Sequence, residues 1–293
     1  MAASNAQVPS GATQPGDVVD WHSHVWLPEH LGSEWGGEID AKYPHTPSRC
    51  GSPELHNEAM RHAGITKCLI VGLRSNHLGL QIPNEYIADA VRHFQGTAIG
   101  LASVDPNSSK ARDQVIHAAT ELQLRGLKLS PPYQAFHPHS PEAYRIYDAA
   151  ADQGMFFMFH QGAVTHRRGV LEVAQPILLD RVARDFPDTK IIIAHMGQPW
   201  HNEVIPMLRK HPNVYADVSA RCSRTTQLAE MLKNARDYGV LPKVLWGSDF
   251  PTFDPLRHMQ DFLAIASLGD PNGISEQEAA DVLYNRPLSL LET

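Results

Sequence analysis

Short apolar runs recur along the chain, and stretches with a helical spacing of apolar residues separate them. The runs are five to eight residues long, which suits strands buried in a parallel sheet. They begin at residues 18, 67, 98, 126, 156, 190, 214 and 244, in VVDWHSH, KCLIVGL, AIGLASVD, GLKLS, FFMFHQG, KIIIAHMG, VYADVSA and VLWGSDF. The pattern predicts helices between them over residues 84–94, 110–124, 141–152, 178–186, 225–238 and 257–267.

Eight strands that alternate with helices predict an α/β fold, a single closed (β/α)₈ or TIM barrel. An open doubly wound sheet has nearly the same rhythm, but no G-x-G-x-x-G motif follows the first strand, which disfavours a dinucleotide-binding fold. We predict a barrel domain over residues 17–293 after a mobile tail over residues 1–16. Residues 26–52 predict an extended loop over the top of the barrel, a common place for lids, and residues 275–291 predict a terminal helix.

Composition narrows the class of protein. Hydrophobic residues make up 42% and charged residues 19%, which favours a folded chain over a disordered one. A net charge of −7 provides no basic field for nucleic acid, and no apolar run is long enough to cross a membrane. The N-terminus lacks the pattern of a signal peptide, so we expect a cytoplasmic protein whose partner is a small molecule. Apolar helix faces are also compatible with a homo-oligomer.

Two histidines stand one residue apart at the end of the first predicted strand. If side chains alternate along a regular strand, Val18, Asp20, His22 and His24 share one face. Two imidazoles on one face can bind one divalent cation when other ligands arrive from elsewhere in the fold. By itself a His-x-His pair is more often a surface feature, so the rest of the chain must decide.

Further polar residues end other apolar runs. The carboxyl ends of the strands of a TIM barrel meet at one rim, where the catalytic groups of such enzymes lie. The residues predicted to meet at this rim are His22, His24, His160, His195 and Asp249. Three imidazoles and a carboxylate suit Zn²⁺, with Mn²⁺, Fe²⁺ or Co²⁺ as alternatives, and leave a fourth imidazole for proton transfer.

The segments DWHSH, FHQG, AHMG and GSDFP resemble the metal-dependent amidohydrolase superfamily, in its amidohydrolase 2 or aminocarboxymuconate-semialdehyde-decarboxylase-like branch. The resemblance covers nearly the whole chain from about residue 17. It implies one metal ion held by His22, His24, His160 and Asp249, with His195 as acid or base. It also implies a TIM barrel whose reactions include hydrolysis of lactones and amides, and non-oxidative decarboxylation.

We therefore expect a hydrolase in which metal-activated water attacks a lactone, ester or amide carbon of a small carboxylated substrate. In this scheme His195 takes the proton of the water, and Asp249 can share that role. One alternative is a decarboxylase of a small aromatic or unsaturated acid. A second alternative is a metal-binding module without catalysis, against which the additional imidazole of His195 counts.

Lys128 in GLKLS introduces a different metal site. Members of the superfamily with two metals use a carboxylated lysine on this strand, and His195 would then be a ligand. We favour an unmodified Lys128 that faces the substrate or supports the structure, because the AHMG and GSDFP segments resemble the one-metal branch. Ser130 stands where relatives often have a histidine, which is expected to alter substrate handling without changing the metal site.

Several residues near the predicted rim are candidates for substrate contacts. Arg74 and Arg221 follow the second and seventh strands, where a guanidinium group could bind a substrate carboxylate. A surface salt bridge explains each of them about as well. Trp26 in the first loop could wall the pocket, and so could Trp35 and Trp200. The basic cluster over residues 166–168 is more typical of a solvated loop.

Overall fold

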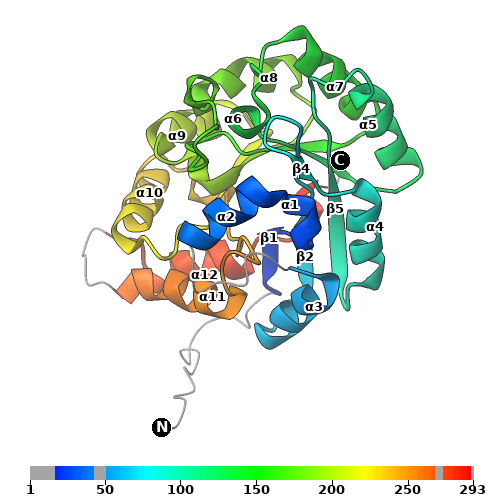
Figure 1. Cartoon of the computed structure of the whole chain (residues 1–293). Helices are drawn as coiled ribbons and strands as arrows, with labels where there is room; N and C mark the ends of the chain where they lie inside the picture. The colour runs from blue at the N-terminus through cyan, green and yellow to red at the C-terminus, as the bar shows by residue number, and fades with distance from the viewer. Residues whose placement is uncertain (1–16, 43–50, 268–272, 292–293) are drawn as a thin grey trace.

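The computed structural model describes residues 17–42, 51–267 and 273–291, and it confirms the predicted TIM barrel (Figure 1). All eight predicted strands are present, each parallel to its neighbour, and they follow one another around the sheet in chain order. They are β1 (Val19–Ser23), β2 (Lys67–Val71), β5 (Thr97–Ser103), β6 (Gly126–Leu129), β7 (Phe156–Phe159), β8 (Ile191–Ile193), β9 (Val214–Asp217) and β10 (Val244–Leu245). A short hairpin, β3 (Arg74–Ser75) and β4 (Leu80–Gln81), follows β2.

Backbone hydrogen bonds between β1 and the segment after β10 close the barrel. The amide of Trp21 donates to the carbonyl of Trp246 at 3.1 Å, and the amide of Asp249 donates to the carbonyl of His22 at 2.7 Å. The amide of His24, like that of Trp21, donates from the β1 side, to the carbonyl of Phe250 at 2.7 Å. These bonds rule out an open doubly wound sheet, because the two edge strands of an open sheet are not bonded to each other.

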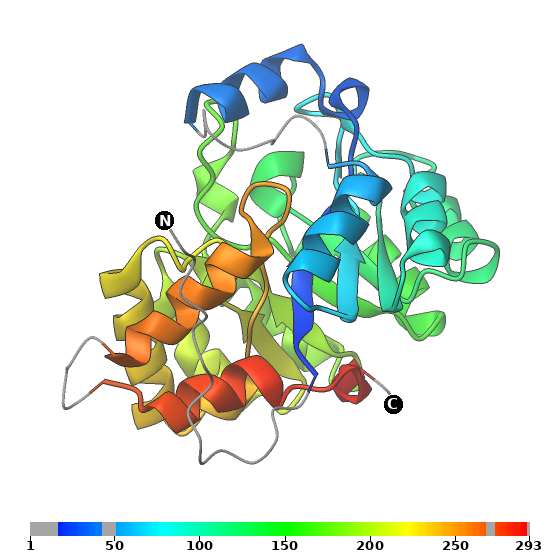
Figure 2. The same cartoon turned by 90° about the horizontal axis from the view of Figure 1, so that it is seen from below.

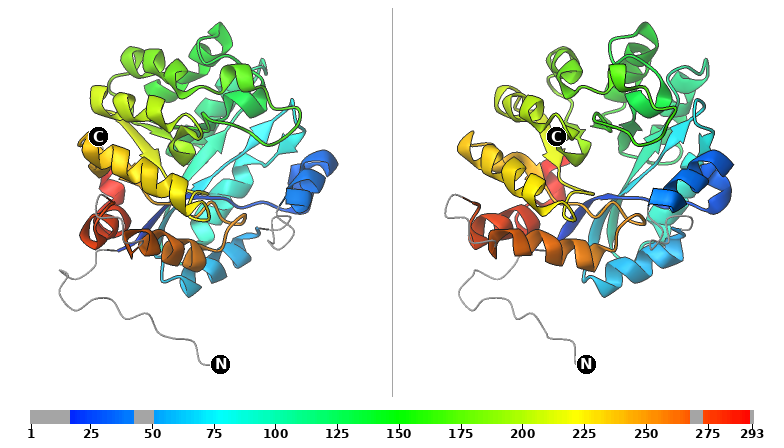
Figure 3. Two further views of the ribbon diagram at one scale, coloured as in Figure 1. Left: turned by 90° about the vertical axis from the view of Figure 1, so that its left-hand side faces the viewer. Right: turned by 60° about the vertical axis from the view of Figure 1, so that its left-hand side comes forward.

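Helices surround the strands, as the side views in Figure 3 show. The predicted helices correspond to α4 (Asn84–His93), α5 (Ala111–Thr120), α7 (Pro141–Asp152), α8 (Leu179–Asp185), α10 (Thr225–Asp237), α11 (Pro255–Ala264) and α12 (Glu276–Tyr284). Beyond residue 52, three helices of the described segments were not predicted: α3 (Pro53–His62), α6 (Pro131–Gln134) and α9 (His201–Lys210). Short 3₁₀ segments are η1 (Leu171–Val173), η2 (Pro176–Leu178), η3 (Ala194–Gly197), η4 (Leu241–Lys243), η5 (Ile265–Ser267) and η6 (Leu288–Leu291).

The strict alternation predicted for the first strand is wrong because β1 contains a bulge. Asp20 pairs with Cys68 and Ser23 pairs with Ile70, so three residue steps of β1 oppose two steps of β2. An extra residue of this kind shifts all later side chains to the other face. Asp20 consequently bonds to Ser248 instead of lining the cavity that His22 and His24 share.

Two apolar clusters hold the barrel together. The larger cluster packs the helices against the strands. The smaller one includes Trp21, Met158 and Ile192 together with Leu291 near the C-terminus. Met158 pairs with Lys128, whose side chain lines the cavity, so this second cluster lies inside the barrel beneath the cavity. A packed interior is typical of TIM barrels and makes a rigid floor for the residues above it.

The extended loop predicted for residues 26–52 is wrong over the residues that the structure describes there. The chain forms α1 (Pro28–Leu31) and α2 (Ser33–Lys42), which lie over the carboxyl-end rim of the barrel (Figures 1 and 2). The prediction treated proline as a loop signal, but Pro28 occupies the first turn of α1, where its missing amide costs nothing. The position above the barrel is as predicted.

Two other expectations concern the ends of the chain and membranes. The tail predicted for residues 1–16 lies outside the described residues. Among the helices of the described segments, none combines the length and the apolar character needed to cross a bilayer.

The seam between β1 and the segment after β10 depends on close packing at Gly247. A Cβ atom at this position would lie 2.8 Å from both the backbone nitrogen and the Cβ atom of His22. We expect Gly247→Ala to lower the free energy of unfolding by about 1–3 kcal/mol, because the seam must move apart. Urea unfolding measures this change. Gly37→Ala is the control, since nothing lies within 4 Å of a Cβ atom there. Equal unfolding midpoints for the two variants would contradict the prediction.

Candidate metal centre

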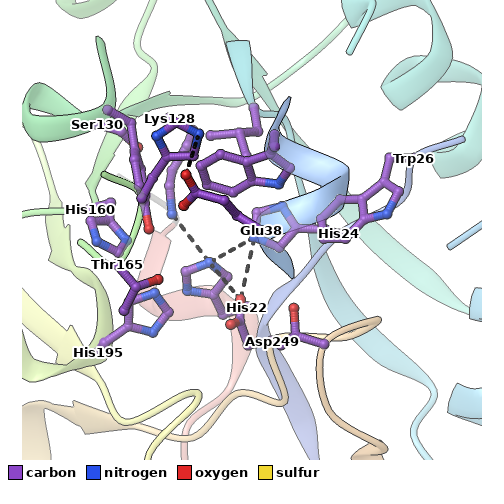
Figure 4. Close-up of a pocket in the computed structure, with 15 residues that line it drawn as sticks. His22, His24, Trp26, Glu38, Lys128, Ser130, His160, Thr165, His195 and Asp249 are labelled. Carbon is purple, nitrogen blue, oxygen red and sulfur yellow. Dashed lines mark hydrogen bonds and ion pairs between the residues drawn. The ribbon is translucent and has the colours of Figure 1, made fainter. Parts of the chain in front are cut away.

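The structure brings the five residues predicted for the rim together in one cavity. His22, His24, His160, His195 and Asp249 all line a cavity of about 120 Å³ at the carboxyl ends of the strands (Figure 4). His22 lies in β1, and each of the other four follows the end of a strand or begins the segment after it.

His22, His24 and Asp249 form the tightest group. The Nε2 atoms of the two histidines lie 3.2 Å apart. Oδ1 of Asp249 lies 3.7 Å from Nε2 of His22 and 3.5 Å from Nε2 of His24. His195 also has a ring nitrogen within 4.8 Å of ligand atoms of His22 and Asp249.

The Nδ1 atoms of three of these imidazoles are turned away from the cavity, toward hydrogen-bond acceptors. Nδ1 of His24 donates to the carbonyl of Val71 at 2.7 Å, and Nδ1 of His195 donates to the carbonyl of Ser219 at 3.1 Å. A carbonyl can only accept, so both Nδ1 atoms carry the proton. Nδ1 of His22 likewise donates to Oδ2 of Asp217 at 2.9 Å. In all three rings Nε2 is left with a lone pair.

This arrangement fits a divalent cation. Two lone pairs on Nε2 atoms 3.2 Å apart repel each other unless a positive charge lies between them. Ligand nitrogens of a tetrahedral zinc ion, at metal distances of about 2.0–2.1 Å, lie about 3.3 Å from each other. The separations among His22, His24 and Asp249 are close to that value. The donor set therefore suits a single ion without rearrangement of these three residues.

Three of the imidazoles, those of His22, His160 and His195, lie in surroundings that favour the neutral form. Burial lowers the pKa of His22 and of His195 well below the usual range, and the positive charges of neighbouring residues add to the effect. Burial also lowers the pKa of His160 to about 3. A neutral imidazole is the form that binds a metal ion or accepts a proton, so these three histidines are in the form that either role requires.

His160 has a different orientation from the one a ligand needs. Its ring lies 5.0 Å from that of His195, but its Nε2 atom is 3.4 Å from the carbonyl of Ala163. The ring of Tyr133 lies against its other side, 4.8 Å away. A ligand role for His160 thus requires its ring to turn, and that role stays a prediction.

Two of the five residues have strained backbones. His195 has φ 54° and Asp249 has φ 61°, both in the left-handed region that residues other than glycine seldom adopt. Such a conformation costs about 1–3 kcal/mol and persists only where the surrounding structure imposes it. Here it turns both side chains into the cavity immediately after their strands end.

Of the four residues predicted to contact substrate, two line the cavity and two do not. Lys128 and Trp26 line the cavity, and Nζ of Lys128 lies 3.2 Å from Nε2 of His22. Burial lowers the pKa of Lys128 to about 8. Arg74 and Arg221 are not among the residues that line the cavity. The charge of Arg221 nevertheless acts on the site, since after burial and other neighbours it contributes to the lowered pKa of His160 and His195.

The cavity wall includes residues that the sequence did not single out, among them Tyr133 and Glu38. The prediction of a solvated loop over residues 166–168 is wrong for His166, which is buried and lines the cavity. Its ring stacks on Trp35 of α2 at 5.4 Å with an interplanar angle of 13°. Trp35 also lines the cavity, as the sequence analysis expected, and α2 is the element that holds it over the rim.

Asp217 and Ser219 at the end of β9 also support the site without lining the cavity. Ser219 Oγ lies 2.8 Å from Nδ1 of His195, and Asp217 bonds to His22. Both residues are fully buried. They follow the apolar start of VYADVSA, so the rule that selected His195 and Asp249 could have found them as well.

Comparisons with known proteins bear on the fold and on the family. A family model described as amidohydrolase matches residues 19–291. A search of curated proteins yields no match. An uncharacterised TIM-barrel protein from Bordetella bronchiseptica is 22% identical with a TM-score of 0.74, and the match covers 94% of this chain and 100% of that one.

Two further solved structures carry functional names. A probable 2-pyrone-4,6-dicarboxylic acid hydrolase from Acinetobacter baumannii, with citric acid bound, is 14% identical with a TM-score of 0.66 over 94% of this chain and 100% of its own. A 5-carboxyvanillate decarboxylase from Novosphingobium aromaticivorans, with bound manganese and a nitrobenzoic acid, is 14% identical with a TM-score of 0.65 over 94% and 97%. At these identities the likeness shows a shared fold.

The geometry of the donor set leads to a prediction about metal content. We expect His22→Ala to weaken binding of Zn²⁺ by more than the roughly 10- to 100-fold that loss of a residue behind a ligand costs. His160→Ala should also lower occupancy if its ring turns toward the ion. Elemental analysis after loading with Zn²⁺ measures the change, with the exposed His62→Ala as control. Full occupancy in His22→Ala would remove His22 from the ligand set.

Proposed function

The chain belongs to the amidohydrolase family, and we propose that it is a metal-dependent hydrolase of a lactone, ester or amide bond in a small carboxylated substrate. The observation that carries this proposal is the set of Nε2 lone pairs on His22, His24 and His195 beside the carboxylate of Asp249. These groups share one cavity with the ammonium group of Lys128. The combination supplies ligands, a base and a positive charge at one place.

The proposed metal ligands are His22, His24, His160 and Asp249. Nitrogen and carboxylate ligands suit Zn²⁺ best, with Mn²⁺, Fe²⁺ or Co²⁺ as alternatives, and one solved structure of the same fold holds manganese. When bound, such an ion supplies Lewis acidity to the carbonyl of the substrate and acidifies water.

His195 is the proposed general base and acid. Its proton is on Nδ1, held by the carbonyl of Ser219, which leaves the Nε2 lone pair to accept a proton from the attacking water. The same nitrogen then returns that proton to the leaving oxygen or nitrogen as the carbon–oxygen or carbon–nitrogen bond breaks. A carboxylate oxygen of Asp249 lies within 4.8 Å of a ring nitrogen of His195, and in this proposal Asp249 shares the proton.

Lys128 is the proposed contact for the negative charge of the substrate. Its side chain is almost fully buried and reaches the cavity floor next to His22. A carboxylate or a developing oxyanion there would replace part of the hydration that the ammonium group lacks. We keep Lys128 unmodified in this scheme. Trp26 forms part of the wall, and roles for Arg74 and Arg221 would require their side chains to move toward the cavity.

Decarboxylation is the second candidate. Trp26, Trp35 and Tyr133 line the cavity, and flat aromatic walls suit the ring of an aromatic acid. In that reaction Nε2 of His195 would first take the proton of a substrate hydroxyl group and then give it to the ring carbon, before the carbon–carbon bond breaks and carbon dioxide leaves. The small cavity and the net charge of −7 support a small-molecule partner and count against nucleic acid. A cytoplasmic location and self-association stay predictions from the sequence.

Product analysis separates the two reactions. We expect the metal-loaded protein to hydrolyse at least one member of a panel of carboxylated lactones, esters and amides, with uptake of one water per bond broken. A parallel panel of hydroxybenzoic acids is assayed for released carbon dioxide. Turnover confined to the second panel would replace the hydrolase with the decarboxylase, and no turnover in either would favour a metal-binding module without catalysis.

His195→Ala tests the division of labour within the site. In the proposal His195 carries protons and does not hold the metal. Its loss should therefore leave most of the metal bound while kcat falls by about 10²- to 10⁴-fold. Metal content and kcat are measured on the same preparation, with His62→Ala as control. Release of about one metal equivalent would make His195 a ligand, as expected for a two-metal site with carboxylated Lys128. Full activity would refute the role given to His195.

A further inference from the structure

Asp217 is a buried carboxylate that no step of the proposed reaction uses. It lies at the end of β9, its exposed fraction is 0%, and it does not line the cavity. Removing a carboxylate from water is costly unless donors replace the lost hydration. Four donors do so here, and every one of them belongs to His22, His195 or Ser219.

The two oxygens of Asp217 face different partners. Oδ2 accepts the Nδ1 proton of His22 at 2.9 Å. Oδ1 accepts the backbone amides of His195 and Ser219, each at 3.0 Å, and also the hydroxyl of Ser219. One carboxylate thus contacts a ligand residue through its side chain and the proposed base through its backbone.

The proton of the Ser219 hydroxyl determines what that group does for His195. A serine hydroxyl has a single proton, and Ser219 gives it to Asp217. Its oxygen is then an acceptor for Nδ1 of His195, 2.8 Å away. The Nδ1 proton of His195 is thus shared between the hydroxyl oxygen and the carbonyl oxygen of Ser219, and Asp217 favours this tautomer through the hydroxyl, whereas it holds the Nδ1 proton of His22 directly.

The backbone contact has a second effect. His195 is in the left-handed region, with φ 54°, and its amide is the group that Asp217 holds. The ring of His195 stacks on that of His22 at 4.9 Å with an interplanar angle of 20°. Both rings are therefore oriented by the same carboxylate.

We propose that Asp217 is the positioning residue that keeps the Nε2 lone pairs of His22 and His195 directed into the cavity, with Ser219 as its relay to His195. The inference rests on the proposed function for the purpose of those lone pairs. The tautomers themselves are independent of it. A residue that orients a metal-binding imidazole in this way typically contributes about 10- to 100-fold to metal affinity.

Asp217→Asn is the decisive variant because the amide has the same shape. Its oxygen must face the three donors from His195 and Ser219, since its NH₂ group cannot accept from them. The NH₂ group then donates to Nδ1 of His22, which moves the proton of His22 to Nε2. The expected results are a switched His22 tautomer in the metal-free protein and a 10- to 100-fold weaker affinity for Zn²⁺.

Two measurements read these effects separately. Long-range ¹H–¹⁵N correlation spectra of histidine-labelled, metal-free protein report the tautomer, with the His22 signals identified by their loss in His22→Ala. Competition with a chelating dye reports the affinity for Zn²⁺. Asp105→Asn is the matched control: Asp105 is equally buried and accepts amides from Asn76 and Asn107, but its recorded side-chain bonds involve no histidine. It should leave both measurements unchanged.

Ser219→Ala tests the relay and also serves if Asp217→Asn does not fold. Loss of the hydroxyl should lower kcat by about 10-fold while KM and the affinity for Zn²⁺ stay within twofold. Nδ1 of His22 lies 3.2 Å from this hydroxyl, but it keeps the shorter bond to Asp217 at 2.9 Å. An unchanged His22 tautomer and wild-type affinity in Asp217→Asn, or wild-type kcat in Ser219→Ala, would overturn the proposal. A wild-type protein that binds no metal would instead refute the proposed function, and the tautomer spectra would still test the role of Asp217.

Discussion

The hydrogen bonds across the seam between the first and last strands are the constraint on which the site depends. The amide of Asp249 donates to the carbonyl of His22, and the amide of His24 donates to the carbonyl of Phe250, both at 2.7 Å. Because the bonds run in both directions, the backbone of Asp249 is held beside His22 despite its left-handed φ. Closing the barrel and bringing the carboxylate to the two imidazoles are consequently one and the same step.

The seam contains a buried carboxyl group, whose hydrogen bonds fix the register between β1 and the segment after β10. The amide and the hydroxyl of Ser248 donate to Asp20 at 2.9 and 2.5 Å, and the amide of His22 donates to it at 3.1 Å. Burial raises the pKa of Asp20 to about 7, so these donors compensate for a costly position. An apolar contact could slide along the strand, whereas a carboxyl group with three donors accepts a single register. Because the bulge in β1 follows Asp20, it turns His22 and His24 into the cavity and leaves Asp20 facing Ser248.

The sequence was sufficient for the architecture and for the convergence of five polar residues at one rim. All eight strands and the convergence of His22, His24, His160, His195 and Asp249 follow from apolar runs that end in polar residues, because parallel strands place those ends at one rim. Features that depend on tertiary contacts were out of reach. The bulge in β1 arises from pairing with β2, and the ring orientation of His160 depends on the carbonyl of Ala163. Asp217 was visible in the pattern, but its importance appears only when its partners are known.

The donors and the walls of the cavity come from different parts of the fold. The donors stand at or next to strand ends, where the seam and Asp217 restrain them. The walls come from other elements: Trp35 from α2, Tyr133 from α6 and Thr165 from the segment after β7. Loops and short helices tolerate change without moving the strands. A probable 2-pyrone-4,6-dicarboxylic acid hydrolase and a 5-carboxyvanillate decarboxylase share the fold of this chain. In this chain the walls are consequently the part of the cavity that can change while the donors stay in place, so the fold alone does not fix the reaction.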